Sequence, residues 1–474
     1  MEVLPPSLSY SASKQALRMN RFQCRPTGAD DATTGSTFRI NLPSKSLVNL
    51  SSFNLCFNLE MSTLVDDAAN WTNAKLPFSH QLFSAVRVYV GGQLVSGGLS
   101  NHYDLLYTGL VKASAGEDWC RSRYNDHARG LIENSDDITG FSARPTANFT
   151  TKRAYYCITD FLGIFRGNGT GRSIIDTSLW GDVSIEFTMN TNACIAKNAA
   201  GTAIRADGGG YTSAANNREI ASALADITYR IQDIEGYVEC ITQTTPLYIK
   251  LITMLLDSKE QQIRFPYQNF VSGIVSSGKN ARLQVNSGCI DSMVVLPLHA
   301  SFNNPRAIVG VADDLSAQRY KFTACDAAGA VITVSNANHT STTGATMQIQ
   351  IGSDTFPKVP INNYLQVSDI TTNSLFSNSL YSQNLLFNGW SGGAAGSSSY
   401  SRQKFLSENF VWVQSFSDGE GWATKILTGI DSASQNLDVI VNSNTPLNGS
   451  LFIGALLTSL LVFDTRTGSV SVVQ

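Results

Sequence analysis

The sequence predicts a mainly β protein made of two β-sandwich or β-barrel units of similar plan in tandem. Hydrophobic residues alternate with polar residues along many short segments, as they do in strands that bury one face. Helical spacing of hydrophobic residues is scarce, which favours the same class. One pattern of strand and turn from the first half of the chain returns in the second half and indicates a duplicated unit.

The alternation is clearest at Phe53, Leu55, Phe57 and Leu59, which are separated by Asn and Cys residues. Clusters of Gly, Asn, Pro and Ser bound this segment and others like it, and supply turns. The other predicted strands lie at residues 86–90, 183–188, 227–242, 347–351 and 437–441.

The spacing of hydrophobic residues predicts a helix over residues 100–114. Its hydrophobic residues form one stripe at i, i+3, i+4, i+7 and i+8, namely Tyr103, Leu106, Tyr107, Leu110 and Val111. Ser100 or Asn101 is the expected N-cap. Weaker helical segments follow Asp369 and lie near residues 217–225.

The repeated pattern relates residues 86–96 to residues 347–357. Each copy consists of an alternating strand, a Gly turn and a short extended stretch. At the same offset Asn101 corresponds to Asn362 and Tyr103 to Tyr364, each at the start of a candidate helix. We therefore expect the join between the two units near Pro246.

Composition excludes several classes of protein. The chain has 474 residues, with 34 Lys and Arg against 37 Asp and Glu, for a net charge of −3. A nucleic-acid binder that uses its whole surface would need a basic excess. Eight Cys without a C-x-x-C pair or a secretory signal indicate free thiols made in a reducing compartment, so we expect synthesis inside a cell without secretion.

Five segments carry strand patterning with Gly and Pro at particular positions, and they occur in order over nearly the whole chain. They are FRINLPSKSLVNLSSFNLCFNLE (38–60), LPFSHQLFSAVRVYVGGQLVSGGLSNHYDLL (76–106), IRFPYQNFVSG (263–273), MQIQIGSDTFPKVPI (347–361) and GSLFIGALLTSLLVFDTRTGSVSVV (449–473). In this order they resemble the double jelly-roll major capsid proteins of tailless icosahedral DNA viruses, a lineage that includes polinton-like viruses, virophages and adenovirus-like viruses.

The resemblance implies two eight-stranded jelly rolls with a few short helices. Residues 1–25 would form a basic N-terminal arm, residues 26–245 the first jelly roll and residues 246–474 the second. Three chains would form a homotrimer, a pseudo-hexameric capsomer that tiles an icosahedral shell. The implied partners are the chain itself, neighbouring capsomers, and penton and minor capsid proteins, with an inner membrane or the genome at the inner face. The implied location is the virion.

The basic arm supplies the candidate site residues: Lys14, Arg18, Arg21 and Arg25. Their spacings of 4, 3 and 4 place them on one face if the segment is helical. We interpret them as inner-face or inter-capsomer contacts with DNA, a membrane or an acidic patch. The alternative is a solvated arm beside the core.

No catalytic, cofactor or metal site is predicted, and no small-molecule substrate is expected. No Cys lies directly beside a His in the sequence, so no Cys–His nucleophile pair is indicated. His102 and Asp104 are interpreted as packing or capping residues at the start of the helix rather than as half of a catalytic set. Adjacent acids such as Asp30 and Asp31 are typical of solvated turns, and a Ca²⁺ site would need several converging oxygens.

Two alternatives to a capsid subunit stay open at this point. A β-sandwich carbohydrate-binding or receptor-binding viral surface protein would need a shallow groove lined by aromatic residues. A β-sandwich glycoside hydrolase or lyase would need two carboxylates facing a cleft. Neither alternative accounts for the ordered strand motifs.

Overall fold

The computed structural model places most of the strands of the chain. The described residues are 17–63, 73–75, 79–98, 101–114, 144–146, 149–166, 173–191, 195–197, 227–243, 262–276, 280–298, 322, 346–361, 366–375, 410–416, 429–432, 438–443, 450–464 and 467–473.

The first half of the chain forms two antiparallel sheets that face each other. Sheet A has the strand order β1 (Leu17–Cys24), β13 (Ile227–Gln243), β4 (Leu47–Thr63), β9 (Phe149–Ile158) and β8 (Arg144–Thr146), with β2 (Ala32–Thr33) and β10 (Ile174–Asp176) pairing with β13 and β4. Sheet B has the order β3 (Thr37–Asn41), β11 (Val183–Met189), β6 (Phe83–Val90) and β7 (Gln93–Ser96). A separate two-stranded ribbon pairs β12 (Ile195–Lys197) with β5 (Asn73–Lys75).

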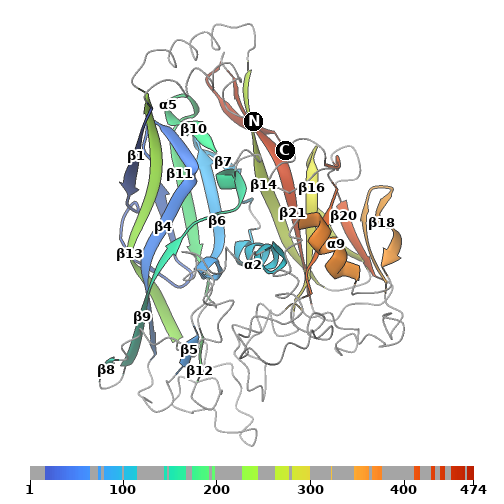
Figure 1. Cartoon of the computed structure of the whole chain (residues 1–474), viewed down its shortest axis with the longest axis horizontal. Coiled ribbons are helices and arrows are strands. Elements are labelled where there is room, and N and C mark those ends of the chain that lie inside the picture. The colour runs from blue at the N-terminus through green and yellow to red at the C-terminus, as the bar shows by residue number, and fades with distance from the viewer. Residues whose placement is uncertain are drawn as a thin grey trace, which may run out of the picture.

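The second half repeats this arrangement (Figure 1). Sheet D has the order β14 (Gln262–Ser276), β21 (Ser450–Asp464), β16 (Ile290–Pro297) and β19 (Trp412–Ser415), with β22 (Val470–Val473) beside β21. Sheet E has the order β15 (Asn280–Gln284), β20 (Asp438–Ser443), β17 (Met347–Ile351) and β18 (Asp354–Ile361).

Both halves have jelly-roll connectivity. The eight principal strands of the first half, in chain order, are β1, β3, β4, β6, β7, β9, β11 and β13. In each half one sheet takes the first, eighth, third and sixth strands, and the other takes the second, seventh, fourth and fifth. This order pairs strands that are distant in sequence and closes two sheets over one core. The predicted duplication is therefore confirmed strand by strand.

The predicted helices also occupy equivalent places. α2 (Tyr103–Ser114) follows the hairpin β6–β7, and α9 (Gln366–Leu375) follows the hairpin β17–β18. The expected N-cap of α2 is wrong. The side-chain amide of Asn101 instead donates to the carbonyls of Val86 (2.8 Å) and Gly97 (2.6 Å), and the first helical turn closes on His102, whose carbonyl accepts from the Leu106 N–H at 3.1 Å.

The shorter helical elements are α5 (Thr177–Trp180) and the 3₁₀ turns η1 (Ser79–Leu82) and η2 (Gly163–Arg166). The expected helix near residues 217–225 lies outside the described residues. In the part of the chain that the structure describes, no helix combines the length and the apolar character needed to span a bilayer.

The alternating residues of β4 line the core as predicted. Phe53, Leu55, Phe57 and Leu59 are buried, and Phe53 packs against Phe161 with ring centroids 5.5 Å apart. The apolar core of the first roll continues without interruption into β14, β16 and β21 of the second. A further cluster, which includes Trp412 and Ile349, fills the space between sheets D and E.

The expected domain limits need one correction. Residues 17–24 of the supposed arm form β1, whose partner along its whole length is β13 in sheet A. The first jelly roll therefore includes residues before 26. The expected join near residue 246 lies outside the described residues, between the end of β13 and the start of β14.

Candidate assembly surfaces

Strand β14 joins the two rolls through three polar contacts. The Tyr267 hydroxyl donates to the carbonyl of Val95 at 2.7 Å. The side-chain carbonyl of Asn269 accepts from the Gly97 N–H at 3.3 Å, and the Ser272 hydroxyl oxygen accepts from the His102 N–H at 3.1 Å. The first two of these hydrogen bonds are buried and the third is part-buried, and together they set the position of β14 against β7 and α2.

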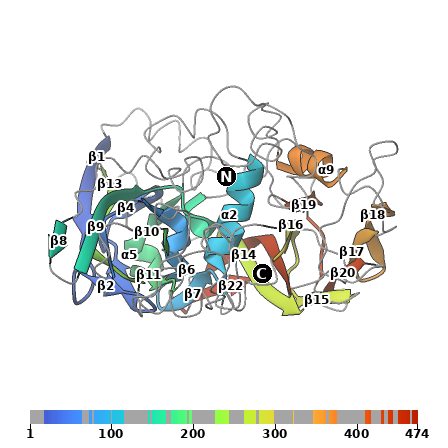
Figure 2. The ribbon, with the colours of Figure 1, turned by 90° about the horizontal axis from the view of Figure 1, so that it is seen from below.

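Close packing supports the same junction between the two rolls, the β14 seam. Helix α2 lies between the two rolls in both ribbon views (Figures 1 and 2). A Cβ atom added at Gly109 of α2 would lie 2.9 Å from Leu296 of β16, and one added at Gly454 of β21 would lie 2.9 Å from Leu106. Trp180 completes the seam, with its ring 6.3 Å from Phe265 and 5.9 Å from Phe463. The described parts of the two jelly rolls are consequently packed side by side over a continuous apolar core.

The predicted basic residues do not form a helical stripe. Arg18 and Arg21 lie on strand β1, whose backbone is extended rather than helical. Arg21 stacks over the Tyr237 ring, with its Cζ 4.8 Å from the ring centroid. Arg25 is exposed just beyond the strand, and Lys14 lies outside the described residues. The structure therefore builds Arg21 into sheet A instead of presenting it on a free arm.

The outer face of sheet A carries a row of polar and aromatic side chains around Arg21. Tyr237 donates to Glu235 Oε2 at 2.6 Å, and Glu235 faces Cys56 across the strand pair β13–β4. Cys56 in turn faces Cys157 across β4–β9, with 3.2 Å between the sulfurs. Sequence reasoning missed this row because register, not local pattern, places its members together.

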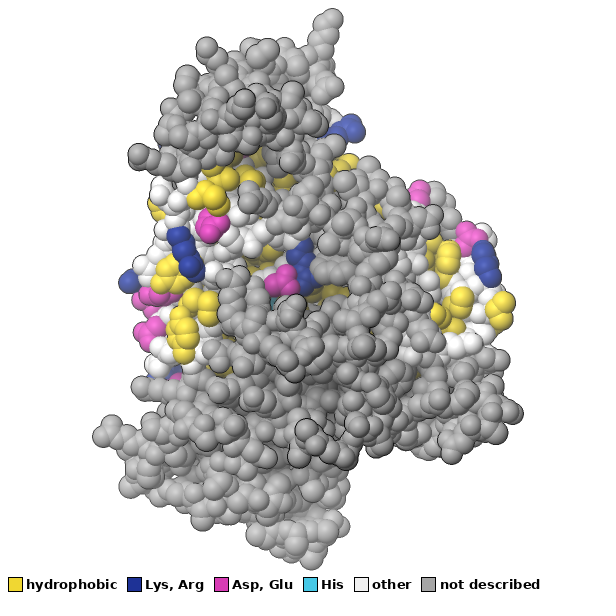
Figure 3. All heavy atoms as spheres, in the orientation of Figure 1, with side chains coloured by type: hydrophobic (Ala, Val, Ile, Leu, Met, Phe, Trp, Pro, Cys, Tyr) yellow, Lys and Arg dark blue, Asp and Glu magenta, His cyan; other side chains and the backbone are white. Residues whose placement is uncertain are grey.

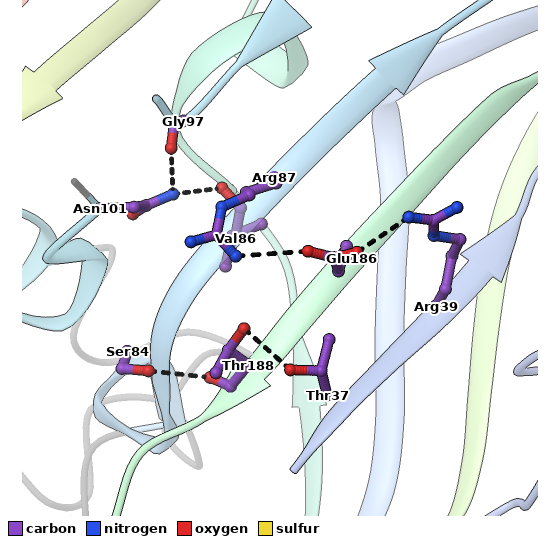
Figure 4. A network of polar contacts seen from close by, with 9 residues as sticks. All are labelled: Thr37, Arg39, Ser84, Val86, Arg87, Gly97, Asn101, Glu186 and Thr188. Atoms are coloured by element: carbon purple, nitrogen blue, oxygen red, sulfur yellow. Dashed lines mark hydrogen bonds and ion pairs between the residues drawn. The ribbon is translucent and has the colours of Figure 1, made fainter. Parts of the chain in front are cut away.

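The outer face of sheet B carries an ion-pair network (Figure 4). Glu186 of β11 accepts from Arg39 of β3 at 2.9 Å and from Arg87 of β6 at 3.3 Å. The Arg39 guanidinium also lies 4.9 Å from the centroid of the Tyr89 ring. Partly exposed pairs of this kind contribute at most about 1 kcal/mol each, so the network chiefly aligns three neighbouring strands.

Exposed large apolar side chains lie on β1 and β18, which are edge strands, and also on β9 (Tyr155) and β22 (Val473). On β1, the edge strand of sheet A, Met19 is 51% exposed and Phe22 is 41% exposed. On β18, the edge strand of sheet E, Val359 is 76% exposed. These strands lie on opposite sides of the molecule (Figures 1 and 2), and the face over β18 shows hydrophobic side chains beside a basic and an acidic one (Figure 3). Apolar groups on sheet edges are typical of surfaces that another chain covers.

His102 and Asp104 make packing and hydrogen-bond contacts within the fold. The His102 ring meets the Phe452 ring edge-on, with centroids 6.4 Å apart. Asp104 is buried, and its Oδ2 accepts from the Asn190 amide at 2.9 Å. Among the described residues, no group of three or more His, Cys, Asp or Glu side chains has the arrangement of a metal site.

The sequence matches no protein-family model and no curated protein sequence. The structure is similar to solved virus structures over almost the whole chain. A chain of the PBCV-1 virus capsid aligns with a TM-score of 0.55 and 10% identity over 97% of each chain. A chain of the Sputnik virophage aligns with a TM-score of 0.52 and 8% identity over 96% of this chain and 88% of that one.

The Faustovirus major capsid protein aligns with a TM-score of 0.51 and 11% identity, over 94% of this chain and 90% of that one. These identities are low, so the likeness concerns the fold. The chain therefore has the double jelly-roll fold of viral major capsid proteins, as the sequence segments predict.

Proposed function

We propose that this chain is a viral major capsid protein that assembles as a homotrimer. The observation that carries the proposal is the duplicated jelly roll, whose two units are joined by the contacts of β14 and by a shared apolar core. One chain supplies two similar units side by side, so three chains supply six units around a threefold axis. A ring of six similar units is nearly hexagonal and can tile a shell.

The exposed edges support a head-to-tail contact within the trimer. A closed ring of three requires a heterologous interface, in which one surface of a chain meets a different surface of the next. The β1 edge with Met19 and Phe22 lies on the first roll, and the β18 edge with Val359 lies on the second, on opposite sides of the molecule. We assign these two edges to that interface, which should bury on the order of 2,000–5,000 Å².

The proposed partners beyond the trimer are neighbouring capsomers and the penton and minor capsid proteins, and the proposed location is the virion shell. The subunit would do mechanical work and turn over no substrate. Its net charge of −3 suits many like copies in contact, because a large net charge would repel itself. The basic residues Arg18, Arg21 and Arg25 are proposed to strengthen contacts with acidic surfaces near the β1 edge.

The solution mass of the purified full chain tests the proposal. Light scattering behind a sizing column should give three times the chain mass of 51.2 kDa. Negative-stain images of the same fraction should show pseudo-hexagonal particles. A single species of 51.2 kDa at micromolar concentration would contradict the trimer, and glycan binding by that monomer would favour a carbohydrate-binding surface protein instead.

A further inference from the structure

Two thiols meet on the outer face of sheet A. Cys56 of β4 and Cys157 of β9 are directly opposite partners in the antiparallel register. Their sulfurs are 3.2 Å apart and share a hydrogen bond, and no disulfide joins them. Cys56 is 5% exposed and Cys157 is half-buried, so the pair reaches solvent through Cys157.

The surroundings favour the thiolate at this pair. The hydrogen bond with Cys157 lowers the pKa of Cys56 to about 6, and the Tyr155 hydroxyl and the Arg21 charge act in the same direction against burial and Glu235. The thiolate is the reactive form of cysteine. The other described cysteines have the opposite character, because burial raises the pKa of Cys24, Cys240 and Cys289.

We propose that Cys56 and Cys157 form a reversible redox site, which a hydroperoxide converts into a disulfide across β4 and β9. The thiolate sulfur of the pair attacks one peroxide oxygen and becomes a sulfenic acid. The O–O bond breaks, and the departing hydroxide takes a proton to give water. The second thiol then attacks the sulfenic sulfur, the S–O bond breaks, and a second water leaves. Two electrons pass from the two sulfurs to the peroxide.

The sheet geometry permits the bond. Directly opposite residues in antiparallel strands have Cβ atoms about 4.5–5.5 Å apart, and a disulfide needs about 3.5–4.5 Å. The two sulfurs must close from 3.2 Å to about 2.05 Å, which asks for a small local approach of the strands. The cross-link joins residues 101 apart in the sequence, so it constrains the unfolded chain and stabilises the fold.

Peptide mass spectrometry of the full chain tests this site. The protein is prepared reduced, freed of reductant, exposed to hydrogen peroxide and then alkylated. The expected first product is a linked pair of peptides containing Cys56 and Cys157. Cys24, Cys240 and Cys289 should remain thiols during the oxidation and should therefore be found alkylated. Dithiothreitol should restore both thiols. Absence of this link, or oxidation of Cys24 and Cys289 at the same rate, would overturn the proposal.

Two variants sharpen the test. In Cys157→Ser the oxidation should stop at a sulfenic acid on Cys56, which dimedone captures. Peroxide should raise the midpoint of thermal unfolding of the unaltered chain and of Cys24→Ala, but not that of Cys157→Ser. Equal shifts in all three proteins would contradict a specific bond. The outcome does not depend on the oligomeric state. The redox site can therefore be disproved while the trimer is confirmed, and the trimer can be disproved while the redox site is confirmed.

Discussion

Gly91 and Gly352 occupy the same place in two hairpins of the two jelly rolls. Gly91 turns β6 into β7 with a φ of 56°, and Gly352 turns β17 into β18 with a φ of 59°. Both values lie in the left-handed region, where a side chain is strained. The equivalence is structural evidence that the second roll repeats the first, down to the conformation of one turn residue.

Gly91→Ala should destabilise the fold more than Gly92→Ala. Both positions have positive φ, and each substitution costs about 1–2 kcal/mol of backbone strain. At Gly91 the new Cβ would also lie 2.9 Å from the Trp180 carbonyl, whereas nothing lies within 4 Å at Gly92. Urea unfolding of the two variants should show the difference in midpoint. Equal midpoints would show that the β6–β7 turn moves away from the Trp180 carbonyl at no cost in stability.

Tyr267→Phe should loosen the seam between the rolls. The change removes the hydrogen bond to the Val95 carbonyl and leaves that buried oxygen without this donor, at a cost of about 1–2 kcal/mol. The matched control is Tyr237→Phe, whose hydroxyl bonds Glu235 on the outer face of sheet A and should matter by less than about 0.5 kcal/mol. Denaturant unfolding measures both. Equal effects would argue against a tight seam at β14.

Val359→Lys should weaken the trimer and leave the fold of the single chain intact. Val359 is 76% exposed, so a charge there costs little in the isolated subunit. In the proposed interface the same charge would lose water and would lie against the β1 edge, whose own charged residues Arg21 and Arg25 are also basic. Light scattering over a dilution series should show dissociation at higher concentration than for the conservative control Val359→Ile. An unchanged trimer would place the interface away from the β18 edge.

Alkylation of Cys56 by iodoacetamide should have a pH midpoint near 6, the pKa to which the Cys157 hydrogen bond lowers it. Cys24 and Cys289, whose burial raises their pKa to about 11, should react only in strong alkali. Peptide mapping after short labelling at several pH values gives all three profiles together. Cys157→Ala, which removes the hydrogen-bond donor, should move the Cys56 midpoint upward; an unchanged profile would remove Cys157 as the cause.

The same thiol links stability to pH. The native pKa of Cys56 lies below its ordinary value of 9.0. Between pH 6 and pH 9 the unfolded chain therefore binds a proton that the native chain does not. Unfolding takes up that proton, so native stability should rise with pH through this window, and it should lose this contribution as pH falls through 6. Urea midpoints of the unaltered chain and of Cys157→Ala, which lacks the hydrogen-bond donor, measure this contribution when they are compared across the window.

Local pattern was enough to predict much of the fold. Alternation located β4, β6, β11, β13, β17 and β20, because a strand between core and solvent needs a hydrophobic residue at every second position. The repeat of a strand, a Gly turn and a helix predicted the second roll. Alternation was less informative for β14, where residues 265–270 are all buried because both faces of the strand are covered.

For the candidate site residues, local pattern was a poor guide. The spacing of Lys14, Arg18, Arg21 and Arg25 describes a stripe only on a helix, and residues 17–24 are a strand. Strand or helix was decided here by pairing with β13, a segment more than 200 residues away, which overrides local propensity. Asn101 is similarly a residue type that often caps helices. Its side-chain amide instead donates to the carbonyls of Val86 on β6 and of Gly97, just after β7.

By itself, the sequence determined the class of the fold, its duplication and the residues that face each core, because hydrophobic periodicity is a local property. Only the tertiary structure decided which distant residues meet: Tyr267 with Val95 at the seam, Glu186 with two arginines, and Cys56 with Cys157. Strand register is set by the packing of whole sheets, and a slip of one residue would send each of these side chains to the other face.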